Sequence, residues 1–371
     1  MIAYYLLVLG YCICTEAFGL TGAGNAWVTP QRLSLQGKMG HAKRGEMRMS
    51  GDDATGSNQM LHVVYRVGDM DKSVKFYQDV FGMKLLRFRD IPEEKYSNAF
   101  LGYGTESKGE HFSIELTYNY GVDSYELGDA FRGMSLSLPS LREVSKAAAA
   151  AEDGSVVSEI SDVEYGPCLV PDEDVKTVSV GTLMTVQDPD GYMFEVHEKS
   201  RRDPVAAVMI SVTNLEKSIE FYEKALGMKL LQKRSNVLKE ASMYAWMGYG
   251  DMNDGAMLEL RYFFGTDKVE QGTAYGQIAV GTPDVFKAAE HIEAAGYVVT
   301  RAPGPVPGIG TKITAVRDPD DYKIGDEFHS ILSPFRMTPD RSLILFSSLA
   351  VRAMIKVLVD AEDLEKELEE E

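Results

Sequence analysis

Few side chains of this sequence could perform covalent chemistry on their own. The chain has three cysteines, of which Cys12 and Cys14 lie near the start and Cys168 stands alone in the body. A single thiol forms no intramolecular disulfide, which fits a reducing compartment, and Cys168 is more typical of a packed or surface thiol than of a nucleophile. The segment GPVPGIGTK at 304–312 resembles a phosphate-binding loop, but it lacks the Gly-Lys-Ser/Thr order.

Histidines and carboxylates are the next candidates, because they bind divalent metals and transfer protons. His197 lies two residues after Glu195. In a strand, both side chains would share one face, so His197 could add a nitrogen to a site that contains Glu195. His111 and His291 fall on segments that we expect at the surface, where a solvated histidine is more common than a ligand.

An internal repeat shows which elements must position such side chains. Each string of the first copy recurs in the same order in the second. The pairs are DKSVKFYQDVFGMKLL (71–86) with EKSIEFYEKALGMKLL (216–231), IELTYNYG (114–121) with LELRYFFG (258–265), ELGDAFRG (126–133) with EQGTAYGQ (270–277), and DPDGY (188–192) with DPDDY (318–322). The chain is therefore a duplicated domain. Extra residues of the first copy fall within 160–178, which we predict to be a loop.

Each copy alternates short strands with helices. LHVVYRV is typical of a strand, and Asp69 can cap the helix that follows. That helix places Val74, Tyr77, Val80 and Phe81 on one face and ends at Gly82. Three further strands complete a βαβββ unit, and a second unit follows in each copy. The predicted fold class is α+β, with tandem βαβββ units forming two homologous domains in one chain.

Length and charge limit the class of protein. The 371 residues favour two domains. A net charge of −18 argues against nucleic acid and anionic membrane as partners. The predicted organisation is a signal-like leader (1–17), a basic transit-like segment (18–58), two domains (59–200 and 201–329) and an atypical C-terminal extension with an acidic helix (330–371). This bipartite leader favours a plastid location, with the secretory pathway or the cytoplasm as alternatives.

Several strings resemble glyoxalase I, the lactoylglutathione lyase of the vicinal oxygen chelate superfamily, in its fused two-domain, plant-like form. They are YRVGDMDKSVKFYQDVFGMKLL, KYSNAFLGYG, IELTYNYGVDSYELG, RAPGPVPG and DPDGY, and the resemblance covers roughly 60–329. It implies a divalent metal, zinc or nickel, in a cup built by units of opposite domains. It also implies glutathione as co-substrate, a hemithioacetal of methylglyoxal as substrate and a chain that works as a monomer. A fused chain could form two such cups.

By this resemblance, the first cup takes the metal ligands His62, Glu115 and Gln277. Arg66 and Asn119 match positions that contact glutathione, where an arginine pairs with a carboxylate. The fourth ligand position falls on Gly325. The carboxylates of Asp326 and Glu327 would reach it only by a slip of one or two residues, and a one-residue slip turns a strand side chain to the other face.

The second cup takes Glu195 and Glu259 as metal ligands. Its two remaining ligand positions carry Gly133 and Ala207, which cannot bind metal. The positions that correspond to the glutathione contacts of the first cup carry Ser211 and Phe263.

The implied reaction is isomerisation of the hemithioacetal to S-lactoylglutathione, in which the metal acts as a Lewis acid and a carboxylate beside it as general base. Glu115 and Glu195 are the candidate bases. One alternative is a degenerate relative that kept the fold as a binding protein. A further alternative, an extradiol dioxygenase, needs two histidines and one carboxylate as iron ligands. Gly133 and Ala207 stand where the second histidine would be needed, which argues against it. Residues 324–354 have no counterpart in the family, so we predict an insertion there.

Overall fold

The structure of the protein is a computed structural model. It describes residues 58–104, 111–166, 179–235, 240–253, 255–306 and 311–328. The leader, nearly all of the transit-like segment, Cys168 and the C-terminal extension lie outside the described residues, so what the sequence predicts for them stays a prediction.

The described residues form two similar halves, each with two βαβββ units. The first half contains β1(Gln59–Arg66), α2(Met70–Phe81), β2(Lys84–Ile91), β3(Tyr96–Gly102), β4(Ser113–Asn119), β5(Phe131–Leu138), α3(Leu141–Ala150), β6(Ser155–Tyr165), β7(Ser179–Gln187) and β8(Met193–Glu198). The second contains β9(Val205–Ser211), α4(Leu215–Leu226), β10(Lys229–Ser235), β11(Ser242–Gly248), β12(Met257–Phe263), β13(Tyr275–Thr282), α5(Val285–Ala294), β14(Val299–Pro305), β15(Lys312–Arg317) and β16(Lys323–Phe328). The predicted fold class is confirmed.

Helix α2 shows why the local sequence folds as predicted. The Asp69 side chain accepts a hydrogen bond from the backbone N–H of Lys72, which satisfies an otherwise unpaired donor of the first turn. At the other end, Gly82 adopts the left-handed conformation with φ 69°, which costs glycine little. Asn214 and Gly227 end α4 in the same way in the second copy, so the repeated sequence produces a repeated helix.

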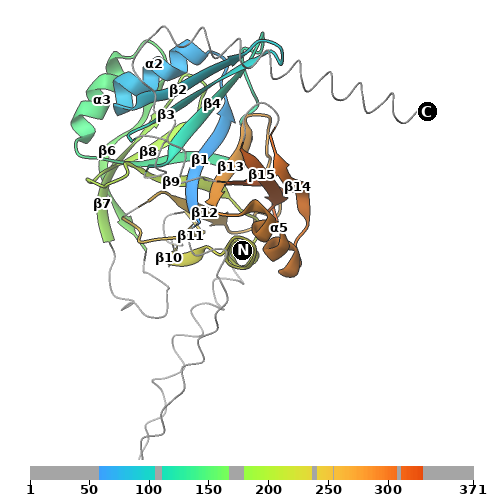
Figure 1. The fold of residues 1–371 in the computed structure, drawn as a ribbon. Helices are drawn as coiled ribbons and strands as arrows, with labels where there is room; N and C mark the ends of the chain where they lie inside the picture. Colours follow the sequence, from blue (N-terminus) through green and yellow to red (C-terminus); the bar gives the residue numbers. More distant parts are fainter. Residues whose placement is uncertain are drawn as a thin grey trace, which may run out of the picture. The chain divides into compact units, whose positions relative to one another are not determined.

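Two sheets of eight strands combine units from opposite halves. The first sheet joins the first unit to the last one, because β1 pairs antiparallel with β13; the blue strand β1 runs beside the orange β13 in Figure 1. The second sheet joins the two middle units through β5 and β9. Each sheet therefore draws side chains from both halves of the chain.

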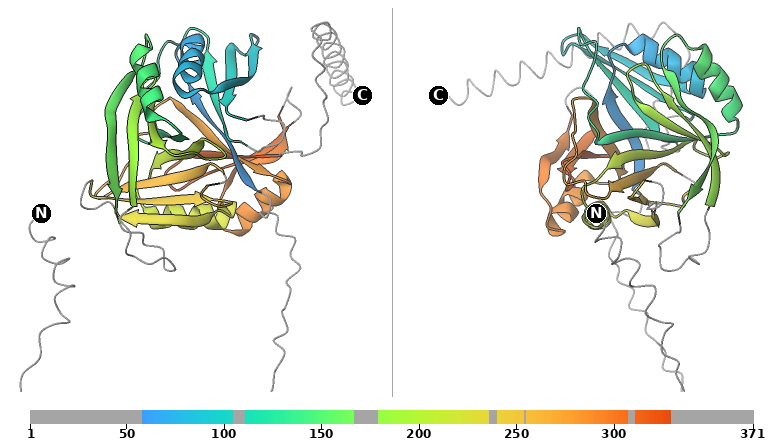
Figure 2. Two further views of the ribbon diagram at one scale, coloured as in Figure 1. Left: turned by 90° about the vertical axis from the view of Figure 1, so that its left-hand side faces the viewer. Right: turned by 180° about the vertical axis from the view of Figure 1, so that it is seen from behind.

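The core lies on the faces of the sheets that the helices cover. Helix α2 packs against α3, and α4 packs against α5 (Figures 1 and 2). Tyr65, Tyr77 and Phe194, all with exposures below 2%, form part of a continuous cluster with Phe131 and Tyr192. Since these residues come from both units of the first half, the core fixes one unit against the other.

One prediction about the first half is wrong in part. We expected a loop within residues 160–178, but β6 continues to Tyr165 and pairs with β7 along its length. The extra residues of the first copy therefore begin by lengthening a hairpin. The prolines and acidic residues that predicted the loop lie within 167–178, outside the described residues, whereas Ser161, Asp162 and Val163 pair with β7 at the edge of the sheet.

Candidate functional site

The first sheet gathers His62, Glu115 and Gln277 on one face. Strand β1 lies between β4 and β13, and Val64 is level with Glu115 on one side and with Gln277 on the other. His62 precedes Val64 by two residues, so it shares this face. We call the face of the sheet around these three side chains the first cup. The structure therefore brings together the three ligands that the sequence predicted.

Direct contacts join His62 to Glu115. The Nε2 atom of His62 lies 3.2 Å from Oε2 of Glu115, and Asn98 Nδ2 donates to the other carboxylate oxygen, Oε1, at 2.5 Å. His62 is buried and packs edge-on against the Phe100 ring, with 5.5 Å between ring centroids. Burial raises the pKa of Glu115, but the contacts with His62 and Asn98 outweigh it and leave the pKa lowered. The carboxylate is thus kept in its anionic form.

The fourth ligand position of the first cup carries no side chain. Gly325 is level with Ala279 on the neighbouring parallel strand β13, and therefore lies two residues beyond the level of Gln277. Glu115 likewise lies two residues beyond the level of His62. A Cβ atom at Gly325 would lie 3.6 Å from the Gln277 carboxamide, so the position has room for a side chain. No register slip brings in Asp326, whose side chain is buried at 1% exposure on the opposite face with its pKa raised to about 7 by burial.

The donor atoms of the first cup fit a divalent ion. Two ligands that bind one ion at about 2.1 Å and at right angles lie about 3 Å apart, and His62 Nε2 and Glu115 Oε2 are separated by 3.2 Å. Asn98 Oδ1 is a further buried oxygen without a hydrogen-bond partner. Imidazole, carboxylate and carboxamide are ligands that divalent metal ions accept. Among the described residues, no group of three His, Cys, Asp or Glu side chains gathers, so the site depends on the amide Gln277.

The two predicted glutathione contacts lie near the same end of their strands. Arg66 ends β1 and donates through Nη1 to the carbonyl oxygens of Thr273, at 2.7 Å, and Tyr275, at 3.2 Å. Asn119 ends β4 and donates to the Tyr125 hydroxyl at 2.9 Å. Because only Nη1 of Arg66 is engaged in these bonds, the rest of the guanidinium can meet a ligand carboxylate.

The second sheet forms a second cup around Glu195 and Glu259, and an arginine lies between them. Arg261 Nη1 and Nη2 donate to the two carboxylate oxygens of Glu195, each at 2.7 Å. Arg261 Nε donates to Glu259 Oε1 at 2.7 Å, and Trp246 Nε1 donates to Glu259 Oε2 at 3.0 Å. Sequence reasoning did not single out Arg261. The available signal was its place in the repeat, where LELRY replaces IELTY and Arg261 stands for Thr117.

The electrostatics of the second cup follow from this arginine. Burial raises the pKa of Glu195, but the Arg261 charge and hydrogen bonds outweigh it and lower the pKa. For Glu259, burial and the nearby Glu195 charge outweigh the effect of Arg261 and leave the pKa raised. His197, which we considered as an additional ligand, has its pKa lowered by burial.

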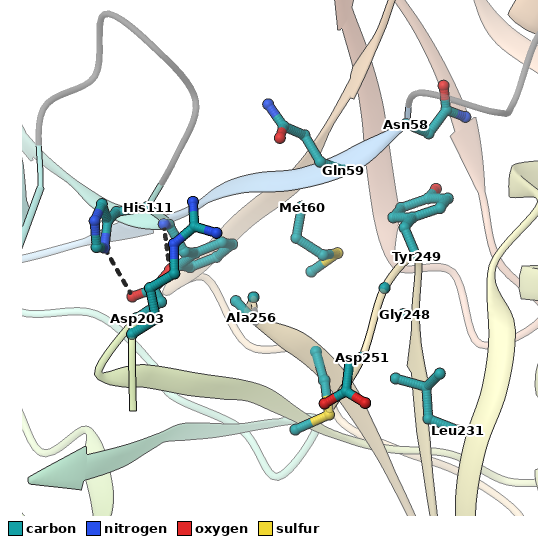
Figure 3. A pocket seen from close by; sticks show the side chains of 15 residues that line it. Asn58, Gln59, Met60, His111, Asp203, Leu231, Gly248, Tyr249, Asp251 and Ala256 are labelled. Atoms are coloured by element: carbon teal, nitrogen blue, oxygen red, sulfur yellow. Dashed lines mark hydrogen bonds and ion pairs between the residues drawn. The ribbon is translucent and has the colours of Figure 1, made fainter. Parts of the chain in front are cut away.

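A cavity of about 330 Å³ lies apart from the predicted ligands of both cups (Figure 3). Its lining includes His111, whose Nδ1 atom lies 3.9 Å from Oδ1 of the buried Asp203. His111 was expected at the surface rather than as a ligand, and its side chain is 20% exposed, so it is partly buried rather than fully solvated. None of the described helices is long and apolar enough to cross a membrane.

The class of the protein follows from a family match over both halves of the chain. The family model "Glyoxalase/Bleomycin resistance protein/Dioxygenase superfamily" matches residues 59–196 and 205–325. The chain belongs to this superfamily, and the resemblance noted in the sequence is confirmed.

Relatives within the superfamily are more specific. The chain is 48% identical over 266 residues to a probable chloroplastic lactoylglutathione lyase of Arabidopsis thaliana, covering 71% of each chain. It is 41% identical over 271 residues to a lactoylglutathione lyase of Oryza sativa, covering 72% of this chain and 88% of the rice protein. The crystal structure of glyoxalase I from Zea mays matches with 43% identity and a TM-score of 0.65, covering 73% of this chain and 92% of the maize chain.

Proposed function

We propose that the chain is a lactoylglutathione lyase that isomerises the glutathione hemithioacetal of methylglyoxal to S-lactoylglutathione in its first cup. The observation that carries this proposal is the convergence of His62, Glu115 and Gln277 from both halves of the chain on one face of the first sheet. The lactoylglutathione lyases of Arabidopsis and rice, at 48% and 41% identity, support the same activity.

In this proposal, His62, Glu115 and Gln277 hold one divalent ion, zinc or nickel. When bound, the ion supplies a Lewis acid that stabilises negative charge on two adjacent substrate oxygens. Asn98 donates to Glu115 and so fixes the orientation of its carboxylate, a role that outer hydrogen bonds commonly have at metal sites.

Glu115 is the proposed general base. It takes the proton from the carbon that bears sulfur and returns it to the neighbouring carbonyl carbon, while the hydroxyl proton of the first carbon passes to the oxygen of the second. The hemithioacetal thus becomes the thioester of a 2-hydroxy acid without any other reactant. Glu195, the other candidate base, is paired through both oxygens with Arg261, so we assign the proton transfer to Glu115. Arg66 and Asn119 bind the glutathione part, with Arg66 facing a carboxylate.

The setting of the enzyme follows from the same comparisons. The Arabidopsis relative is named chloroplastic, which supports the plastid location that the leader predicts. Both cups are built within one chain, so a monomer has what it needs for the reaction. Plastid import of a fluorescent fusion and light scattering of the purified protein test these two statements.

The activity test uses the full chain, stripped of metal with a chelator and reloaded with zinc or nickel. Formation of the thioester from methylglyoxal and glutathione is measured for the wild type and for His62→Ala and Glu115→Gln. We expect both variants to lose at least about 99% of kcat/KM, which corresponds to about 2.7 kcal/mol of transition-state stabilisation. His291→Ala, on the exposed side of α5, is the matched control. Wild-type activity in both site variants refutes the assignment to the first cup.

A second candidate function is a binding protein that retains the fold without turnover. The empty position at Gly325 favours it, because the first cup then offers three predicted ligands rather than four. Calorimetric titration with S-methylglutathione separates the two functions. Binding without thioester formation under any metal supports the binding protein, whereas turnover that depends on added metal supports the lyase.

A further inference from the structure

The second cup contains an internal cation. Arg261 is buried at 8% exposure and Glu259 at 4%, and the guanidinium makes three hydrogen bonds of 2.7 Å to the two carboxylates. A fork-to-fork pair of this kind is both strong and geometrically specific. Glu195 belongs to β8 of the first half, while Glu259 and Arg261 belong to β12 of the second. The arginine therefore joins the two halves.

The position of this guanidinium corresponds to a metal position. In the first cup, Glu115 lies two residues beyond the level of His62 on the adjacent parallel strand. In the second cup, Ala207 is level with Met257 on the adjacent parallel strand, so Glu259 lies two residues beyond the level of Ala207. The carboxylates of the second cup thus point to the place that the predicted ligands share in the first cup, and Arg261 has its positive charge there.

The strand geometry also prevents one of the two lost ligands from being replaced. Gly133 has φ +97°, and a Cβ atom there would lie 1.9 Å from the Met193 carbonyl oxygen. No side chain fits that position without moving the backbone. Without Arg261, the second cup would retain two carboxylates and no neutral ligand at the predicted positions.

We propose that Arg261 replaces the metal ion of the second cup, so that this cup is a metal-free ion-pair clamp between the two halves and excludes divalent cations. The exclusion does not depend on catalysis. Only its corollary, that the chain carries a single functional ion, rests on the proposed function of the first cup. The clamp gives the interface between the halves a fixed charge pairing that chelators cannot remove.

The test measures cobalt binding in a chain whose first cup is disabled by His62→Ala and Glu115→Ala. Isothermal titration and metal analysis after dialysis give the number of Co²⁺ ions per chain. We expect none in this double variant. One bound ion that disappears when Glu195→Gln is added overturns the proposal, and this result requires no change at Arg261.

The second arm adds Arg261→Thr to the disabled chain, because the first copy has Thr117 at this position. We expect the melting temperature to fall by about 5 °C or more, since a buried ion pair loses one partner. We also expect one Co²⁺ to bind and to recover part of this loss. Arg132→Thr, which changes another arginine that lines the cavity beside Glu195 and Arg261, should do neither.

The outcomes separate the two proposals. A folded Arg261→Thr chain that gains no Co²⁺ site shows that the arginine is not what keeps the metal out, and it overturns the clamp. If Arg261→Thr does not fold, the ion count of the disabled chain still decides the question. Failure of the lyase assay in the wild type refutes the proposed function without changing either measurement of the second cup.

Discussion

Asp188, from the DPDGY string, is a buried carboxyl whose replacement gives a quantitative prediction. Its side chain is 2% exposed. Oδ1 accepts hydrogen bonds from the backbone of Asp190, at 3.0 Å, and of Tyr192, at 2.8 Å, and Oδ2 accepts from the Tyr77 hydroxyl at 2.6 Å. Burial outweighs these bonds and raises the pKa from 3.8 to about 7. The folded protein therefore prefers the neutral form of this group.

The sign of the pH effect follows from proton linkage. Between pH 3.8 and about 7 the folded chain retains a proton on Asp188 that the unfolded chain has lost, so the free energy of unfolding falls as pH rises. The difference of about 3 between the folded and unfolded pKa corresponds to a loss of about 4 kcal/mol in the free energy of unfolding, and this loss is fully present above pH 7. In Asp188→Asn this penalty is absent. The asparagine oxygen retains the backbone bonds, and its N–H can donate to the Tyr77 hydroxyl, which can in turn donate to Tyr65.

We therefore expect Asp188→Asn to have a higher free energy of unfolding than the wild type. This advantage should be about 3 kcal/mol larger at pH 8 than at pH 5. Urea unfolding of the full chain, followed by far-ultraviolet circular dichroism at both pH values, measures this difference. Asp318→Asn, at the corresponding position of the second copy with a pKa of about 7, should behave alike. The exposed Asp267→Asn should show no such trend. An equal effect of Asp188→Asn at both pH values refutes the reasoning.

Three further predictions concern glycine and amide positions around the cups. Gly325→Glu should bind Ni²⁺ at least about tenfold more tightly in calorimetry, about 1.4 kcal/mol, because it adds the missing ligand; unchanged affinity contradicts this. Asn98→Leu should weaken Ni²⁺ binding about 10- to 100-fold, since Glu115 loses its orienting donor, and an unaffected Kd would count against that role. Gly133→Ala should lower the melting temperature by about 5 °C or more, because its Cβ would meet a backbone carbonyl at 1.9 Å. Gly250→Ala, which has open space, is its control and should leave the melting temperature unchanged.

The fold could be predicted because local signals and the repeat agreed. Capping residues such as Asp69 and Gly82 lie where the helical periodicity begins and ends, and the second copy repeats them at α4. The family resemblance predicted only that units of opposite halves combine. The pairing of β1 with β13, and of β5 with β9, is known from the structure, since strand order across distant units is not a local property. The extent of β6 was missed because turn-forming composition does not determine where an edge hairpin stops pairing.

The sequence could predict a site residue only where its role follows from its position along its own strand. The repeat gave the level of Glu115 and Glu259, and the same register left Gly325 without a side chain, as the structure has it. Arg261 was missed because its role depends on Glu195, which is 66 positions away in sequence. A long arginine side chain that bonds to a distant strand is not revealed by the hydrophobic periodicity of its own strand. The repeat revealed only that an arginine stands in place of a threonine.

Arg261 also explains how the second cup can lack its neutral ligands and still fold. The buried carboxylate of Glu259 and the partly buried one of Glu195 would repel each other without a cation between them. Removing one partner of a buried ion pair typically costs about 3 to 5 kcal/mol. Glu195 and Glu259 are therefore structural partners of the arginine. Glu195→Gln should accordingly lower the melting temperature of the metal-stripped chain, because it leaves the guanidinium with one carboxylate. If Glu195 were instead an unpaired carboxylate awaiting a metal, its neutralisation would raise the melting temperature, so the sign of the shift decides between the two roles.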